Sequence, residues 1–261
     1  MAISWLDNRV SAELLKLAES VAKDAGSLLM NRPDTFTLTE KSSVIDFATQ
    51  MDQQAEKMIV EKLLAARPDD GIVAEEGASS SSKSGITWVI DPIDGTVNYL
   101  YGLPGWSISV AAKDKDGLVV GVVYAPTLNG LWSAIRSQGA TYNGKKIKCN
   151  DPVALDKALI ATGFAYDLKV RVGQAQTIAN LLPKVRDVRR IGSAAVDLCY
   201  VAMGAVDAFF ESALNEWDVS AGGLIATEAG AKISGKGGGA PDRELTVCAG
   251  PALHAALLPL L

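Results

Sequence analysis

The chain has 261 residues, and 48% of them are hydrophobic, which is enough to bury a core and excludes an intrinsically disordered protein. No apolar run approaches the ~20 residues that cross a bilayer, and Asp7 and Arg9 interrupt any candidate signal peptide, so we expect a soluble, cytoplasmic protein without membrane partners. The net charge is −5 and the basic residues are scattered, which argues against a nucleic-acid partner.

Helical and strand patterns alternate over the first ninety residues. Apolar residues recur at helical spacing over residues 11–31 and again over 47–67, and a proline follows each run. Two short apolar runs, 71–74 and 88–90, are typical of buried strands. Residues 78–85 between them are nearly all serine, which indicates a flexible surface loop.

Strands and turns dominate the next part of the chain. We expect strands over 107–112, 118–124 and 131–135, and Asn143-Gly144 is a strong hairpin signal. Helices and strands then alternate, with strands expected over 158–162, 188–191, 206–210 and 246–249, and helices over 172–182, 194–203, 218–229 and from Pro251. This order predicts an α/β or α+β fold with a seam near residue 150.

Carboxylates are the main candidates for chemistry, because His254 is the only histidine and the three cysteines are isolated. Three acidic clusters lie where predicted strands end: Glu75-Glu76, the segment DPIDGT from Asp91 to Thr96, and Trp217-Asp218. Ligand sites in open α/β sheets gather at strand ends. Each cluster alone is as consistent with an ordinary turn or a solvated strand end. Their conjunction in an apolar setting favours a shared site.

The segment DPIDGT has the features of a magnesium and phosphate site. Asp91 and Asp94 flank a proline turn and can converge on one point, and Gly95 allows close backbone approach. Thr96 lies at the start of a segment whose free N–H groups favour an anion. Hard oxygen ligands beside an anion site suit Mg²⁺ that also holds a substrate phosphate.

Four segments resemble the inositol monophosphatase family. WVIDPIDGTVNYLYGLP, from Trp88 to Pro104, is similar to its first signature, and WDVSAGGLIATEAGA, from Trp217 to Ala231, is similar to its second. Upstream, EKSSVIDFATQMD and AEEG also match, in the family's order. The resemblance implies a layered αβαβα sandwich of the inositol monophosphatase/fructose-1,6-bisphosphatase type. Residues 1–150 would then carry most metal ligands, and residues 151–261 the substrate contacts and Asp218.

The resemblance implies a site for two to three Mg²⁺ ions. Carried over to this chain, the ligands are Glu75, Asp91, the Ile93 carbonyl, Asp94 and Asp218. Two ions would clamp the attacking and leaving oxygens of an in-line displacement by an activated water. Inhibition by lithium at one of these sites is also implied.

Further residues gain roles from the same resemblance. Glu75 and the Thr96 hydroxyl would orient and deprotonate the attacking water, and the amides of Gly95 and Thr96 would hold the phosphoryl oxygens. Lys41 and Asp52 would lie near a third, weaker ion and its waters. Glu76 would support them from outside the ligand set. Family precedent also suggests a homodimer.

Substrate contacts are expected from Ser193, Ala194, Glu211, Asn215 and Asp218. Gly192–Ala195 is similar to the inositol phosphatases, and Glu211 occupies a position that holds inositol hydroxyls. Many members carry histidine where this chain has Asn215, which can still donate to a substrate hydroxyl but cannot titrate near neutral pH.

Inositol 1-phosphate is therefore the predicted substrate of a Mg²⁺-dependent phosphomonoesterase. Histidinol phosphate and 3′-phosphoadenosine 5′-phosphate stay open as alternatives, and so does fructose 1,6-bisphosphate, whose second phosphate Arg189 and Arg190 could bind. A different class of function is a non-catalytic binding or regulatory relative. Such a protein would be expected to have lost a metal ligand, and none is lost here.

Overall fold

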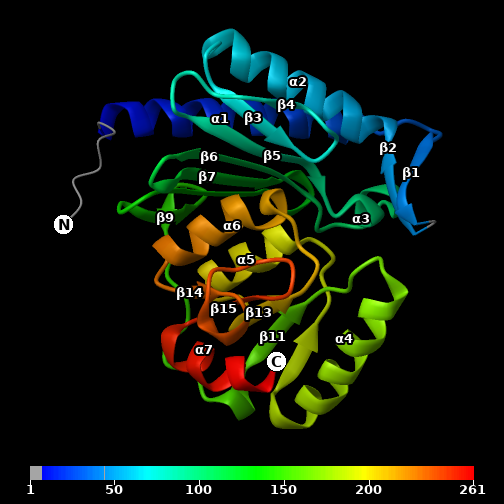
Figure 1. Cartoon of the computed structure of the whole chain (residues 1–261), viewed down its shortest axis with the longest axis vertical. Coiled ribbons are helices and arrows are strands. Elements are labelled where there is room, and N and C mark those ends of the chain that lie inside the picture. Colours follow the sequence, from blue (N-terminus) through cyan, green and yellow to red (C-terminus); the bar gives the residue numbers. More distant parts are fainter. Residues whose placement is uncertain (1–7, 44) are drawn as a thin grey trace.

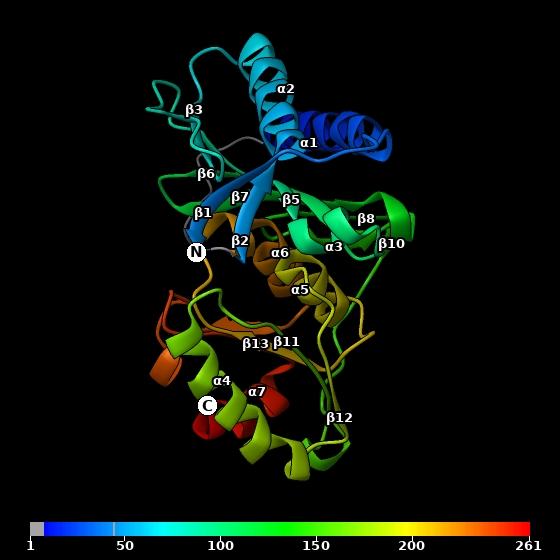
Figure 2. The same ribbon diagram turned by 90° about the vertical axis from the view of Figure 1, so that its right-hand side faces the viewer.

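The computed structural model describes residues 8–43 and 45–261. Residues 1–7 lie outside the described residues. The prediction that the N-terminal segment is not a signal peptide falls partly on them. The chain forms five layers, in the order helices, sheet, helices, sheet, helices (Figures 1 and 2). Within the described part of the chain, no helix is long and apolar enough to cross a membrane.

Two helices cover the outer face of the first sheet. Helix α1 (Asn8–Met30) buries Leu14, Ala18, Val21 and their neighbours at three- and four-residue spacing, and α2 (Gln50–Ala66) packs beside it. The sheet has eight strands in the order β10-β9-β8-β7-β6-β5-β3-β4. In chain order these are β3 (Gly71–Ala74), β4 (Ser79–Ser80), β5 (Thr87–Asp94), β6 (Ser107–Asp114), β7 (Gly117–Ala125), β8 (Gly130–Ile135), β9 (Gly139–Tyr142) and β10 (Lys145–Lys146).

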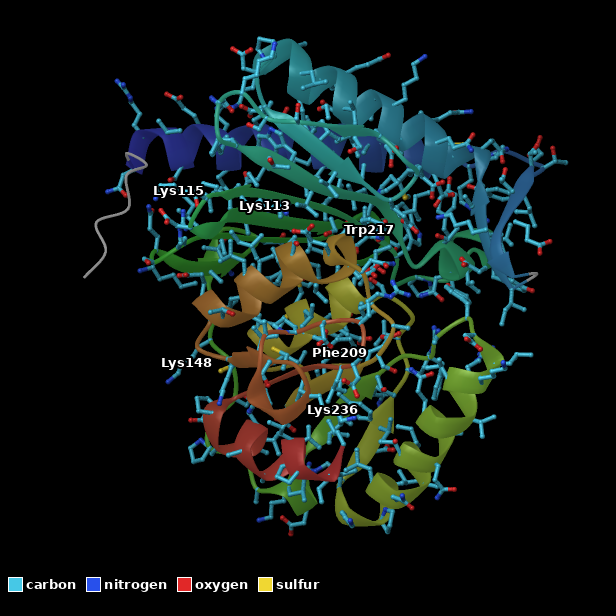
Figure 3. All side chains as sticks on the ribbon, in the orientation of Figure 1. Lys113, Lys115, Lys148, Phe209, Trp217 and Lys236 are labelled. Carbon is cyan, nitrogen blue, oxygen red and sulfur yellow. The ribbon has the colours of Figure 1, made fainter. Side chains whose placement is uncertain are left out.

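The middle layer consists of two helices that are buried on nearly all sides. They are α5 (Ala194–Ala202) and α6 (Glu216–Glu228), which pack on each other between the two sheets. A Cβ at Gly121 of β7 would lie 2.8 Å from the carbonyl oxygen of Ala221 in α6, so glycine allows this helix to lie directly on the sheet. In Figure 3 Trp217 stands at the start of α6, beneath the first sheet.

The second sheet has five strands in the order β12-β11-β13-β15-β14. They are β11 (Leu159–Thr162), β12 (Asp187–Arg189), β13 (Ala208–Glu211), β14 (Lys232–Ser234) and β15 (Thr246–Ala249). The first three run parallel to one another, whereas β15 is antiparallel to both β13 and β14. Phe209 of β13 is fully buried against the middle layer (Figure 3). Helices α4 (Leu168–Leu181) and α7 (Pro251–Leu257) form the fifth layer.

The fold class expected from the sequence is confirmed, and most elements lie within a few residues of their expected positions. The hairpin of β1 (Leu38–Ser43) and β2 (Asp46–Thr49) was not expected, because its first strand is polar and shows no alternation. Helix α2 accordingly begins at Gln50, after β2. The expectations also missed α3 (Thr96–Tyr101) as a full helix and β14. The serine-rich loop contains the two-residue strand β4.

The first sheet ends with β10 at Lys146, and the second begins with β11 at Leu159. Both α5 and α6 nevertheless contact strands of the first sheet as well as the second. The division into subdomains 1–150 and 151–261 therefore stays a prediction.

Candidate active site

Three carboxylates from distant parts of the chain converge at the end of β5. Asp91, Asp94 and Asp218 each offer an oxygen, and these three atoms lie within 4.8 Å of one another. The pairing of β5 with β6 is irregular between Asp91 and Asp94, where Pro92 bends the strand, so both carboxylates reach the same side. Asp91 accepts a hydrogen bond from the Ile93 N–H at 3.0 Å, which holds the turn. Oxygen donors at this spacing fit a hard divalent cation.

Asp91 and Asp94 are buried, Asp218 is half-buried, and the three carboxylates repel one another. Burial raises the pKa of Asp91 and Asp218 well above their usual value, and the neighbouring acids raise them further. Burial also raises the pKa of Asp94, to about 6, against hydrogen bonds from the start of α5. Three carboxylates this close together are unfavourable without a counter-ion, and a bound cation would remove that repulsion.

Helix starts fix two of the three carboxylates. Asp218 lies in the first turn of α6, where its Oδ2 accepts a hydrogen bond from the Asn215 N–H at 2.5 Å. Asp94 accepts from the first turn of α5, through the Ser193 hydroxyl and the Ala195 N–H. Ser193 was expected to contact substrate, but its hydroxyl donates a hydrogen bond to Asp94 and accepts one from the backbone at the start of α5.

Glu75 lies at the end of β3 and is paired with Lys41 from β1. The Lys41 Nζ donates to Glu75 Oε1 at 2.8 Å and to Glu76 Oε1 at 2.5 Å. Burial works against the charge of Lys41, but the two glutamates outweigh it and raise the pKa of Lys41 above its usual value. Burial raises the pKa of Glu76 to about 7, although Lys41 opposes this. The hairpin missed in the sequence therefore delivers the only lysine that lines the cavity among the described residues.

Asp52 lies behind Thr96 rather than in the cavity. The Thr96 hydroxyl is 3.2 Å from Asp52 Oδ1 and 3.1 Å from the Ile93 carbonyl oxygen, and it can donate to either. Asp52 also accepts from the backbone and side chain of Thr49, the residue that caps α2. Burial raises the pKa of Asp52 to about 6, with Thr49 opposing the shift.

A cavity of about 300 Å³ joins these groups. Except for Asp52, every residue predicted for catalysis, metal binding or substrate binding lines it: Lys41, Glu75, Asp91, Ile93, Asp94, Gly95, Thr96, Ser193, Ala194, Glu211, Asn215 and Asp218. Gly95 has a φ of 93°, and a Cβ there would lie 3.0 Å from the Gly192 carbonyl oxygen, so the close approach requires glycine.

Glu211, Asp197 and Arg190 form a polar part of the cavity wall. Burial raises the pKa of Glu211 to about 8, whereas Arg190 lowers it and Asp94 raises it. A side chain at Gly163 would collide with the Glu211 carboxylate. Asp197 of α5 is 1% exposed, and its Oδ1 has no hydrogen-bond partner among the described residues. Burial, with Glu211 adding to it, raises the pKa of Asp197.

The lining residues that were not singled out from the sequence include Tyr166, Asp197 and Arg243. Arg243 comes from the loop before β15 and donates a hydrogen bond to Asn215 Oδ1. Asn215 is thereby left with its amide NH₂ for a substrate. Of the arginine pair, Arg190 lines the cavity, whereas the Arg189 Nη1 donates a hydrogen bond to Asp187 Oδ2 at 2.6 Å.

Comparison with known families decides the identity of this site. A sequence model of the inositol monophosphatase family matches residues 11–261. The chain belongs to the inositol monophosphatase family. An "Inositol-1-monophosphatase" of Mycobacterium leprae is 39% identical over 95% of this chain and 93% of its own length. A protein of Escherichia coli named "Nus factor SuhB" is 39% identical over 87% of this chain and 86% of its own.

Solved structures of the family share the fold. The extragenic suppressor protein suhB from Bartonella henselae superposes with a TM-score of 0.90 at 30% identity, covering 95% of this chain and 98% of that one. Membership supports phosphatase activity on a small phosphorylated substrate, with a metal ion at the acidic cluster.

Proposed function

We propose that the chain hydrolyses inositol 1-phosphate with Mg²⁺. The observation that carries this proposal is the cluster of Asp91, Asp94 and Asp218 beside Gly95 and Thr96. An all-oxygen donor set in a buried acidic pocket fits Mg²⁺ better than softer metals. When bound, Mg²⁺ supplies Lewis-acid activation of water and neutralises charge on the phosphoryl group.

The protein's own residues would then perform four tasks. Asp91, Asp94, Asp218, Glu75 and the Ile93 carbonyl would hold two to three ions. The backbone amides of Gly95 and Thr96 would donate hydrogen bonds to the phosphoryl oxygens. The Thr96 hydroxyl would orient the attacking water and accept a proton from it. Asp52, which is within hydrogen-bond reach of that hydroxyl, would receive the hydroxyl's own proton in turn. Lys41 would balance the charge of Glu75 whenever an ion leaves.

The alcohol half of the substrate would lie against Glu211 and Asp197. These two carboxyl groups and Arg190 can together accept and donate several hydrogen bonds, which suits a ring of hydroxyl groups. Arg190 alone faces the cavity from the arginine pair, which weakens the case for a second phosphate. Histidinol phosphate, fructose 1,6-bisphosphate and 3′-phosphoadenosine 5′-phosphate remain the alternatives.

A phosphate-release assay over these four compounds tests the proposal. We expect the highest kcat/KM with inositol 1-phosphate, no release without Mg²⁺, and full loss of activity on addition of a chelator. A preference for another compound would overturn the substrate and leave the phosphatase in place. No release from any monoester would overturn both.

A second candidate is a role as a Nus factor, because four relatives that are 37–40% identical carry that name. The two roles separate in a host whose own gene carries Asp94→Asn. If phosphatase activity is the whole function, this strain should behave as a deletion strain does. A separate, non-catalytic role predicts that it behaves as the wild type does.

A homodimer is the expected assembly. Leu168 and Val172 of α4 are 69% and 73% exposed, and Leu182 just beyond the helix is 49% exposed, on the same helical face. Helix α4 lies on the outside of the second sheet (Figure 2). Light scattering should give twice the chain mass for the wild type and a monomer for Val172→Glu. A wild-type monomer would contradict the assembly.

A further inference from the structure

A buried glutamate outside the cavity holds the turn that follows Glu75. Glu56 lies in α2 and is 5% exposed. Its Oε2 accepts a hydrogen bond from the Glu76 N–H at 2.7 Å, and its Oε1 accepts one from the Ala78 N–H at 2.9 Å. Both carboxylate oxygens are thus used by the backbone of the turn between β3 and β4.

This contact fixes the direction in which the chain leaves β3. The Glu75 N–H donates to the Ile90 carbonyl oxygen at 3.2 Å, so the sheet holds Glu75 on one side. On the other side the next amide, that of Glu76, is held by Glu56. The turn contains Gly77 with a φ of 113°, and the serine-rich segment that follows is mostly exposed. Without Glu56, the two amides would lose their only side-chain acceptor among the described residues.

Glu56 lies one helical turn after Asp52 on the buried face of α2. Asp52 reaches the Thr96 hydroxyl, and Glu56 reaches the turn after Glu75. One face of one helix therefore supports two separate parts of the cavity, the end of β3 and the start of α3. A rigid helix fixes these distances better than a loop does.

We infer that Glu56 is a positioning residue that sets the place of Glu75 at the metal centre. The inference rests on the proposed Mg²⁺-dependent function. A neutral amide at this position would face one of the two N–H groups with its own NH₂, so at least one bond would be lost. Partners that orient a metal ligand typically change metal affinity 10- to 100-fold when they are removed.

The chain contains a matched control for this contact. Glu228 of α6 also accepts two backbone N–H groups of a turn, from Ser137 at 2.7 Å and Gly139 at 2.8 Å. That turn joins β8 to β9 and carries none of the residues that line the cavity. Glu228 is half-buried, so its substitution tests the loss of a two-amide clamp without a change near the metal centre.

The experiment compares Glu56→Gln with Glu228→Gln. Isothermal calorimetry would measure Mg²⁺ affinity, phosphate release would measure the Mg²⁺ concentration for half-maximal rate, and thermal melts in chelator would measure the fold. We expect Mg²⁺ affinity to fall roughly 10- to 100-fold in Glu56→Gln and less than twofold in Glu228→Gln.

Equal Mg²⁺ affinity in Glu56→Gln and the wild type would overturn the inference, and so would an equal loss in both variants. If Glu56→Gln does not fold, Glu56→Asp keeps the charge with a shorter reach, and the same two outcomes apply to it. A wild type that binds Mg²⁺ but releases no phosphate would instead overturn the proposed function and leave the calorimetric comparison valid.

Discussion

Ser193 and Asp94 are 99 positions apart in the chain, and the Ser193 hydroxyl donates to Asp94 Oδ2 over 2.5 Å. The Ala195 N–H donates to the same oxygen at 2.7 Å. The first turn of α5 thus fixes the carboxylate at the end of β5 and leaves its other oxygen for a cation. The start of α5 therefore helps to build the metal centre, and a substitution there should change the affinity for Mg²⁺.

Ser193→Ala tests this relationship. The substitution removes the hydroxyl but keeps the Ala195 amide, so we expect Mg²⁺ affinity to fall about 10- to 100-fold. It also removes the cap of α5, which costs about 1 kcal/mol of unfolding free energy. Calorimetric titration of Mg²⁺ and chemical unfolding in chelator measure the two effects separately. A stability loss with unchanged Mg²⁺ affinity would reduce Ser193 to a helix cap.

Metal binding should oppose the pH dependence of stability that these carboxylates produce. The folded state raises the pKa of Asp91, Asp94 and Asp218, to about 6 for Asp94. Between the unfolded value near 4 and the folded value, the folded protein holds more protons than the unfolded chain. The metal-free protein should therefore lose stability as pH rises from about 4 through about 6 and above.

Magnesium needs the deprotonated carboxylates, so its stabilisation should grow over the same pH range. At 100 times its dissociation constant a ligand adds about 2.7 kcal/mol, or roughly 5–10 °C for a chain of this size. Thermal melts at pH 5 and pH 8, with Mg²⁺ and with chelator, measure the difference. An equal rise in melting temperature at the two pH values would contradict the assignment of these acids to the metal.

The parts of this site that depend on residues close together in the sequence could be predicted, whereas the parts that depend on contacts between distant residues could not. The DPIDGT turn and the ends of β3 and β5 follow from local patterns, and residues from all of them line the cavity. Long-range placement was less accessible. Asp52 has the spacing of an ordinary helix residue, and only the capping of α2 by Thr49 turns it towards Thr96.

Side-chain direction was the second limit. Nothing in the pair Arg189-Arg190 tells which residue faces the cavity, because that depends on the pleat of β12 and on Asp187 beside it. Asp197 lies in an apolar helix, whose pattern predicts a position in the core. Only the packing of α5 between two sheets brings Asp197 to the cavity wall. The hairpin β1–β2, which carries Lys41, is short and polar and gives no periodic signal.

Lithium inhibition provides a test of ion exchange at the cluster. We expect Li⁺ to inhibit by occupying a Mg²⁺ position that includes Asp218, since a site of full carboxylates can hold either cation. Asp218→Asn removes one charge from that position and should weaken both Mg²⁺ activation and Li⁺ inhibition. Initial rates over a grid of the two ions measure both. Li⁺ inhibition that is indifferent to Asp218→Asn would place the inhibitory ion elsewhere.

Substrate choice should depend on Glu211 in a pH-dependent way. Burial raises the pKa of Glu211 to about 8, so near pH 7 the carboxyl group is mostly protonated, with one donor and limited acceptor capacity. Above pH 8 the carboxylate can accept two substrate hydroxyls, and a charge-assisted hydrogen bond contributes about 1.5–3 kcal/mol, or one to two orders of magnitude in kcat/KM. The preference for inositol 1-phosphate over p-nitrophenyl phosphate should therefore rise as pH passes 8.

Glu211→Gln should abolish that rise, because its amide keeps the shape of the side chain but does not titrate. The ratio of kcat/KM for the two substrates, measured from pH 6.5 to pH 9, separates this effect from the general pH dependence of the metal centre, which acts on both substrates alike. We expect the ratio to climb in the wild type and to stay flat in the variant. Equal losses on both substrates at every pH would mean that Glu211 supports the fold or the metal ligands and does not select the alcohol.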